Sequence, residues 1–209
     1  MNLKGLNRIG GILGLIAAGA ATTACQPLTN STAAACILAI TADAGASGQR
    51  PLSNTAYVAQ SFLPQGAEST TTLSVSSVAL KLITASTNNT NVSGTIFVAI
   101  EADQSTSTTT TVPTSPNGIA LAVGTLDAAT VNLNQPLYYT IPLSSTVTLN
   151  AGTVYWVGAF ASYSSGGTSF VAWRGTPVSA YAQGSVSTST GGLTWASAAG
   201  SMDLQIGCQ

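Results

Sequence analysis

The residue types that usually carry out chemistry in proteins are scarce in this chain. It has no histidine, six carboxylates, five basic residues and three cysteines. Because histidine is the commonest general base and metal ligand, its absence argues against most hydrolytic sites. A zinc site without histidine would need sets of cysteines, which the chain lacks. We therefore predict that the protein is not an enzyme and requires no cofactor.

Glu101 and Asp103 are the only closely spaced carboxylates. Residues two apart on a strand share a face, so both side chains could project outward. Together with loop carbonyls they could bind Ca²⁺, which prefers oxygen ligands. The alternative is a pair of solvated acids at a strand end.

Lys81 is the only lysine after the first two dozen residues, and serine is plentiful. A Ser–Lys pair could in principle provide a nucleophile. Lys81 stands between Leu80 and Leu82, on the polar side of its expected strand. This position predicts an exposed lysine and not a catalytic one.

Aromatic residues are the remaining candidates for ligand binding. Trp156 lies in the most apolar expected strand, which predicts a core position. Trp173 and Trp195 lie near strand ends, where an exposed indole ring, together with Tyr163, could stack against a sugar. Arg174 could stack on an aromatic ring, bind a carboxylate or pair with an acid of the chain. These residues define an alternative function, a carbohydrate-binding module.

The first 24 residues form a segment distinct from the rest of the chain. Lys4 and Arg8 precede an apolar run over residues 9–21, which suits a signal peptide and is short for a membrane span. Residues 22–24 are small and resemble a cleavage site. We predict a signal peptide or an uncleaved hydrophobic anchor over residues 1–24, and hence contact with a membrane through the N-terminus.

Cys25 follows this segment directly and resembles the acylated cysteine of a bacterial lipobox. The fit is partial, because Thr22 stands where the lipobox usually has leucine. Lipidation of Cys25 would anchor the mature chain, and Gln26 after the cysteine implies an outer membrane or cell surface. Residues 25–35 are small and polar and are expected to be a tether.

Cys36 and Cys208 both fall on the apolar side of an alternating run, at the two ends of the expected β domain. Export implies an oxidising compartment, in which a disulfide between them would join the first and last strands. In the chain-entropy model such a long loop contributes about 4–5 kcal/mol, less any strain. The alternative pairing is Cys25 with Cys36, which leaves Cys208 free.

The charge pattern excludes some partners. Charged residues are 5% of the chain and its formal charge is −1. Without a basic surface, nucleic acid is not an expected partner. Few charged residues also leave strand edges poorly protected, so self-association is one expected kind of contact.

Residues 36–209 show short apolar alternations separated by turn signals, and none shows a helical period. Apolar parity changes by one residue across Ser76–Ser77, which predicts a β-bulge. Thr153–Ala161 is apolar on both faces and should be a central strand. A weak strand is expected over Ala180–Val186. We predict an all-β fold, a jelly-roll-like antiparallel β-sandwich, preceded by the short hydrophobic segment.

Four stretches in this order resemble the choice-of-anchor domains of bacterial surface proteins. They are Ala59–Phe62, Leu73–Leu82, Thr146–Gly158 with its Leu-Asn-Ala-Gly-Thr-Val-Tyr-Trp sequence, and Ser201–Gly207. The resemblance covers roughly residues 55–208. It implies an exported, non-catalytic sandwich, and a jelly-roll order in which the first and last strands are neighbours.

These observations lead to one expected function and two alternatives. We expect an exported, surface-anchored structural or adhesive β-sandwich protein. The first alternative is the carbohydrate-binding module described above. The second is a decoration or fibre protein of a virion or extracellular filament, which would retain its N-terminal hydrophobic segment.

Overall fold

The computed structural model describes residues 37–41, 44–64, 72–105, 113–133, 135–163, 168–182 and 184–208. The predicted segments 1–24 and 25–35, with Cys25, lie outside the described residues, as does Cys36. No helix among the described residues is both long and apolar enough to span a membrane.

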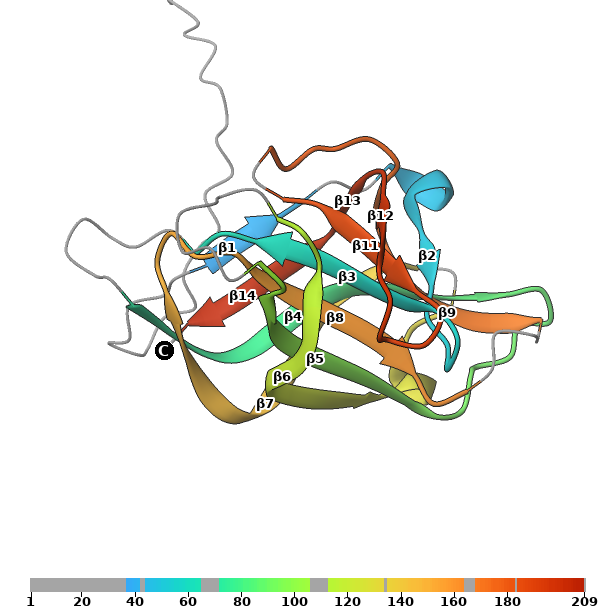
Figure 1. The fold of residues 1–209 in the computed structure, drawn as a ribbon. Helices are drawn as coiled ribbons and strands as arrows, with labels where there is room; N and C mark the ends of the chain where they lie inside the picture. Colours follow the sequence, from blue (N-terminus) through green and yellow to red (C-terminus); the bar gives the residue numbers. More distant parts are fainter. Residues whose placement is uncertain are drawn as a thin grey trace, which may run out of the picture. The chain divides into compact units, whose positions relative to one another are not determined.

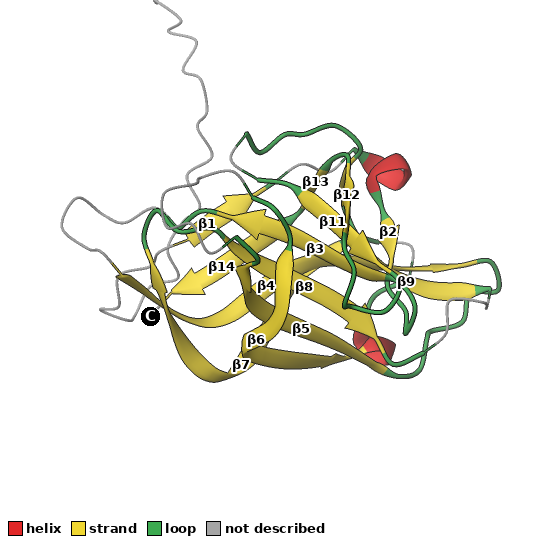
Figure 2. Ribbon diagram, in the orientation of Figure 1, coloured by secondary structure: helices red, strands yellow, loops and turns green. Residues whose placement is uncertain are grey.

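The described residues form strands and two short 3₁₀ helices, with no α-helix among them (Figure 2). The strands of the first half are β1 (Ile37–Ile40), β2 (Arg50–Pro51), β3 (Tyr57–Phe62), β4 (Thr72–Ser86), β5 (Thr95–Asp103) and β6 (Pro116–Asp127). Those of the second half are β7 (Leu137–Asn150), β8 (Tyr155–Ala161), β9 (Ser169–Trp173), β10 (Gly175–Thr176), β11 (Val186–Ser189), β12 (Ala196–Ala198), β13 (Ser201–Met202) and β14 (Leu204–Cys208). The 3₁₀ helices are η1 (Gly45–Gly48) and η2 (Ala128–Thr130).

The main sheet has the strand order β1-β14-β4-β7-β6-β5-β8-β3-β11-β12, and its named strands all pair antiparallel (Figure 1). Strands β6 and β7 pair only between Gly124 and Leu143. The sheet therefore curls at this point into two halves, β1-β14-β4-β7 and β6-β5-β8-β3-β11-β12, which enclose apolar side chains from both. The predicted antiparallel, sandwich-like all-β fold is confirmed.

Alternating side chains explain why β5 has one face in the core. Ile96, Val98 and Ile100 are buried, whereas Phe97 and Ala99 are half-buried on the opposite face. Strand β8, which lies between β3 and β5, is buried on nearly all its length. The prediction of a central strand in this region is confirmed.

Strand β4 contains the predicted bulge. Its pairing with β7 shifts register between Val75 and Ser77. The shift lets apolar residues before and after it face the same core. The prediction from apolar parity is therefore confirmed.

The first and last described strands are neighbours, as the jelly-roll order implies. Strand β1 pairs with β14, with Ile37 opposite Gly207 and Ile40 opposite Leu204. The predicted weak strand over Ala180–Val186 is wrong at the described residues 180–182, 184 and 185, and β11 begins at Val186. The hydroxyl of Ser201 accepts hydrogen bonds from the amides of Ala180 and Tyr181, which divert this stretch from strand pairing.

A three-strand junction is formed where β4 changes partner. One edge of β4 pairs with β14 up to Leu80 and with β9 from Leu82 onward. Between these two pairings, the amide of Lys81 donates to the carbonyl oxygen of Asp203 at 3.3 Å. The amide of Asp203 donates to the carbonyl oxygen of Arg174 at 2.9 Å, and the amide of Arg174 donates to the carbonyl oxygen of Lys81 at 2.8 Å. These three backbone hydrogen bonds close a ring.

Trp173 packs beside this ring and is fully buried. Its indole Nε1 donates to the carbonyl oxygen of Asp203 at 2.7 Å. The expectation that Trp173 is exposed is therefore wrong, because its strand ends at an internal junction and not at the surface.

We predict that Trp173→Ala lowers the free energy of unfolding by about 3–5 kcal/mol, since it removes a fully buried aromatic side chain. The measurement is urea unfolding followed by circular dichroism. Leu193→Ala, at a residue that is 91% exposed, is the control and should change stability by no more than about 0.5 kcal/mol. Equal effects of the two substitutions would contradict this account of the core.

Candidate functional site

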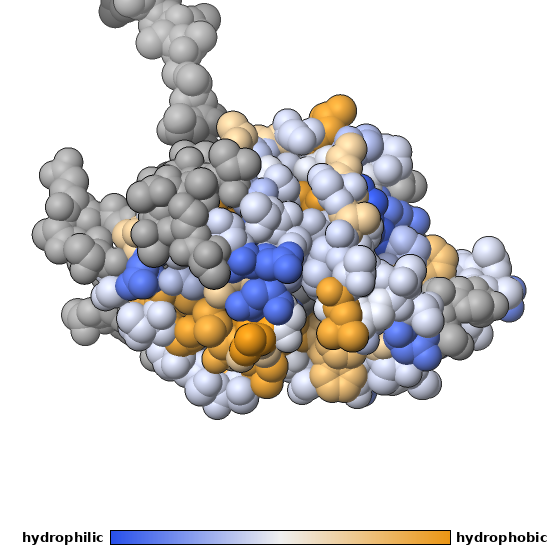
Figure 3. All heavy atoms as spheres, viewed as in Figure 1, coloured by the Kyte–Doolittle hydropathy of each residue, from blue (hydrophilic) through white to orange (hydrophobic). Residues whose placement is uncertain are grey.

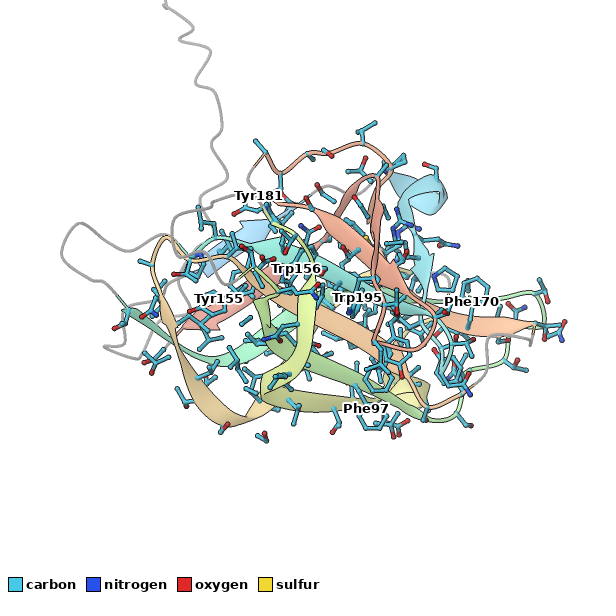
Figure 4. The ribbon with its side chains drawn as sticks, viewed as in Figure 1. Phe97, Tyr155, Trp156, Phe170, Tyr181 and Trp195 are labelled. Atoms are coloured by element: carbon cyan, nitrogen blue, oxygen red, sulfur yellow. The ribbon has the colours of Figure 1, made fainter. Side chains whose placement is uncertain are left out.

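The described residues contain a groove of about 290 Å³ on the outer face of β5, β8 and β3. We call it the outer groove. Its floor and walls include Ala99 and Glu101 of β5, Gly158 and Phe160 of β8, and Tyr57 of β3, while Gly191–Leu193 and Trp195 lie over it from the segment that joins β11 to β12. Figure 4 shows Trp195 in front of these strands.

The hollow follows from small residues placed side by side. Ala99, Gly158 and Ala59 are direct cross-strand partners on β5, β8 and β3. Since neighbouring rows carry larger side chains, the row of small ones leaves a depression in the sheet surface. A methyl group added at Gly158 would lie 3.4 Å from Oε1 of Glu101, which places that carboxylate over the glycine.

An aromatic ladder bounds one end of the outer groove. The rings of Phe97 and Phe160 stack with centroids 4.9 Å apart, and those of Phe160 and Tyr57 with centroids 4.4 Å apart. Gly192, at φ +76°, lies against the Tyr57 ring, where a Cβ would come within 3.0 Å of it. The segment between β11 and β12 can thus approach the sheet closely because it carries glycine there.

Glu101 provides the charge of the outer groove. Its Oε2 accepts a hydrogen bond from the amide of Gly118 at 2.8 Å. Burial raises the pKa of this carboxyl group, and the Gly118 bond opposes the rise. The carboxylate is therefore held in a fixed position in a partly desolvated site.

Trp195 contributes a hydrogen-bond donor. Its side chain is half-buried, and its indole Nε1 is buried with no hydrogen-bond partner among the described residues. Such groups are uncommon, because an amide or indole N–H removed from water is normally paired. Trp195 was predicted as an exposed ring, and its ring forms part of the groove instead.

Asp103 does not share the outer groove with Glu101. Its oxygens accept from the amides of Ser105 and Thr114, the hydroxyl of Thr114 and the indole of Trp156, at 2.7–3.0 Å. Trp156 is fully buried, as predicted, although it lies on the face of β8 opposite to Tyr155, Val157 and Ala159 of the core cluster. A carboxylate surrounded by four donors does not fit a cation site, and no three His, Cys, Asp or Glu side chains cluster among the described residues.

The other predicted ligand residues lie apart from the outer groove. Arg174 is 7% exposed, and its Nη1 donates to Oε1 of Gln49 at 3.4 Å, so it offers no open surface for stacking. Tyr163 is half-buried; its hydroxyl accepts from the amide of Val171, and burial raises its pKa to about 12. Of the four predicted aromatic and basic ligand residues, the outer groove contains only Trp195.

Lys81 is also less exposed than predicted. Its Nζ lies 3.6 Å from a carboxylate oxygen of Asp203, whose side chain is 1% exposed. The pairing of β4 with β14 brings this acid alongside, a contact that local alternation does not indicate.

Sequence reasoning missed Tyr57 and Phe160 and assigned Glu101 a different role. The outward residues of β5 and β8 alternate as Phe97-Ala99-Glu101 and Trp156-Gly158-Phe160. A glycine between two outward aromatic residues was the available signal. This glycine forms part of a groove only because the strand register places it beside Ala99.

Apolar side chains are exposed beside the outer groove. Ile119, Leu121 and Val123 of β6 are 67%, 42% and 46% exposed. Figure 3 shows apolar side chains gathered in the lower half of this face of the molecule. A second hollow of about 450 Å³ also reaches Tyr57, and its lining includes Arg50 and five Thr or Ser residues.

The comparisons with known proteins assign no family. A search of protein-family models finds no match, and a search of curated proteins finds none either. The resemblance to choice-of-anchor domains therefore stays a prediction that rests on the sequence stretches given above.

We predict that the stability of the protein rises as the pH falls from 7 towards the ordinary glutamate pKa of 4.5, by a contribution from Glu101. Because the folded-state pKa is raised, the folded chain binds this proton before the unfolded chain does. Glu101→Gln should remove the contribution and raise stability at pH 7. Urea unfolding of the unsubstituted and the Glu101→Gln proteins between about pH 4.5 and 7.5 measures both effects. If the free energy of unfolding changes with pH equally in the two proteins, the prediction is refuted.

We also predict that Asp103→Asn lowers the free energy of unfolding by about 1.5–3 kcal/mol, because the new amide NH₂ faces donors. Thr114→Val removes one of the four bonds and should have a smaller effect. Thermal unfolding with Ca²⁺ and with a chelator completes the test. A midpoint that rises with Ca²⁺ would restore the predicted calcium site.

Proposed function

We propose that this chain is a non-catalytic β-sandwich module, exported and held at an outer membrane or cell surface by its N-terminal segment, with a structural or adhesive role. The observation that carries the proposal is the pairing of β1 with β14. Strand β1 begins at Ile37, two residues after the expected tether ends, so an anchored N-terminus would be joined to the sheet by backbone hydrogen bonds.

The use of the charged side chains supports a non-catalytic role. Asp103 holds the ends of the loop between β5 and β6, and Asp127 accepts from the amide of Ala129 at the start of η2. Asp203 pairs with Lys81 in the interior. Each of these groups is engaged in a structural contact, and none stands beside a serine or cysteine in a nucleophile–base arrangement given by the described hydrogen bonds.

A disulfide between Cys36 and Cys208 is part of the proposal. The β1–β14 register pairs Ile37 with Gly207 and Leu38 with Ile206. A disulfide would follow if this pairing continued by one residue to Cys36, which lies outside the described residues. Directly opposite residues on antiparallel strands have Cα atoms about 4.5–5.5 Å apart, which lies within the range that a disulfide can bridge.

The intact mass of the native protein, with and without reductant, tests the proposal. We expect a mass that starts at Cys25 with added acyl chains, and a gain of two hydrogens on reduction. A mass that starts at Met1 would contradict export by cleavage and favour the alternative, a virion or filament protein that retains its apolar N-terminus.

Two variants separate anchoring from the disulfide. Cys25→Ser should release the protein from the membrane fraction without changing its stability. Cys36→Ser together with Cys208→Ser should leave it in the membrane fraction and lower its stability by about 2–5 kcal/mol. Release by the double variant, or retention of the Cys25→Ser protein, would contradict the assigned roles.

A further inference from the structure

The second hollow lies between β2 on one side and β11 and β12 on the other (Figure 1). Among its described lining residues Arg50 alone is charged, and the others are mainly hydroxyl-bearing or small. We propose that the second hollow binds the carboxylate group of a small organic monoanion, with Arg50 as its anchor. This inference goes beyond the proposed function and does not rest on it.

The strand register leaves the space for such a ligand. Val58, Thr188 and Ala196 are direct cross-strand partners on β3, β11 and β12. Because this row ends in an alanine at β12, its side chains leave room beside them. Arg50 comes to the same place from β2, which pairs with β9. The guanidinium and the row of small side chains therefore belong to different strands that the fold brings together.

The guanidinium of Arg50 has donors that the protein does not use. Its Nη2 donates to the carbonyl oxygen of Ala199, at the bend after β12, and this bond fixes the group in position. Arg50 makes no ion pair with any described carboxylate. Burial nevertheless lowers its pKa, because the charge has lost part of its hydration. A guanidinium carries several N–H donors, so those left over can meet an anion.

Hydroxyl side chains supply further donors around the second hollow. Those of Thr188, Thr190 and Thr194 make no hydrogen bond to the described residues. The hydroxyl oxygen of Ser189 accepts two backbone amide bonds, which leaves its own O–H to donate. With no carboxylate among the described lining residues, the second hollow offers an anion donors of both kinds and no repelling charge.

The charge of the second hollow selects a monocarboxylate among anions and excludes cations. One guanidinium balances one negative charge, whereas a phosphate dianion would keep a charge without a partner. The planar fork of an arginine matches the two oxygens of a carboxylate and can bind both at once. A cationic ligand would be repelled by Arg50, and a neutral one would leave its charge uncompensated.

The remaining walls and the size indicate the rest of the ligand. Pro51, Ala56 and Ala196 offer small apolar side chains beside the hydroxyl groups. At about 450 Å³ the second hollow falls within the range of ligand sites, which run from about 300 to 1,000 Å³. It has room for a compact apolar body, such as a single ring, that carries the carboxylate.

The test is an NMR titration of the full chain in mild detergent with four probes: benzoate, acetate, inorganic phosphate and choline. We expect benzoate to bind saturably with a dissociation constant of about 1 mM or lower. Acetate should bind more weakly, since it lacks the apolar body, and phosphate and choline should bind more weakly still. Added salt should weaken the binding of benzoate, because an ion pair at a partly exposed site is screened.

Three substitutions locate the binding. Arg50→Lys keeps the charge but removes the fork, and should weaken benzoate binding by about tenfold. Arg50→Met removes the charge and should abolish binding, with circular dichroism to verify that the protein still folds without the bond to Ala199. Thr188→Val keeps the shape and removes one hydroxyl, and should weaken binding by about threefold to tenfold. Thr140→Val, at an exposed threonine of β7 that does not line the second hollow, is the matched control and should bind normally.

Three results would overturn the inference. The first is no saturable binding of benzoate up to about 10 mM. The second is binding of phosphate or choline at least as tight as that of benzoate. The third is binding of benzoate that Arg50→Met and Thr188→Val leave unchanged. None of these measurements depends on how the chain is anchored, so their failure would leave the proposed function standing.

Discussion

The ring of three backbone hydrogen bonds among Lys81, Arg174 and Asp203 is the constraint on which the rest of the sheet depends. At this ring β4 stops pairing with β14 and starts pairing with β9, so one long strand serves two neighbours along the same edge. Three of the few charged residues stand at this point, with Lys81 paired to Asp203 and Trp173 packed alongside. A chain with 5% charged residues thus places three of them where strands meet.

The outer groove is a consequence of the way the second half of the sheet is covered. Strand β8 is apolar on both faces, so its outward side needs cover as well as its core side. The segment between β11 and β12 supplies it, with Gly192 against Tyr57 and Trp195 over the strands. Because this cover rests on an aromatic ladder at one end and on small residues beside it, a hollow remains in which Glu101 is held.

Local alternation was enough to predict much of the fold and little of the site. The central strand, the bulge at Ser76–Ser77 and the pairing of first and last strands were all encoded in apolar parity or in the order that the resemblance implied. The burial of Trp173 was not encoded in this way, because a strand end at the surface and a strand end at an internal junction have similar sequences. Local alternation did not predict the outer groove either, since its residues come from five separate segments and only the register brings Gly158 beside Ala99.

The place of β1 also has a mechanical meaning. Strand β1 is held by four residue pairs to β14, and a pull from an anchored N-terminus would reach the first of these pairs, at Ile37 and Gly207, before the others. If the pull acted across the strands, these pairs would separate one after another and not all together. Without a covalent link, β1 would detach from β14 at low force while the other strands of the sheet stay paired. A Cys36–Cys208 bond would carry the same force into β14 and, through its pairing, into β4.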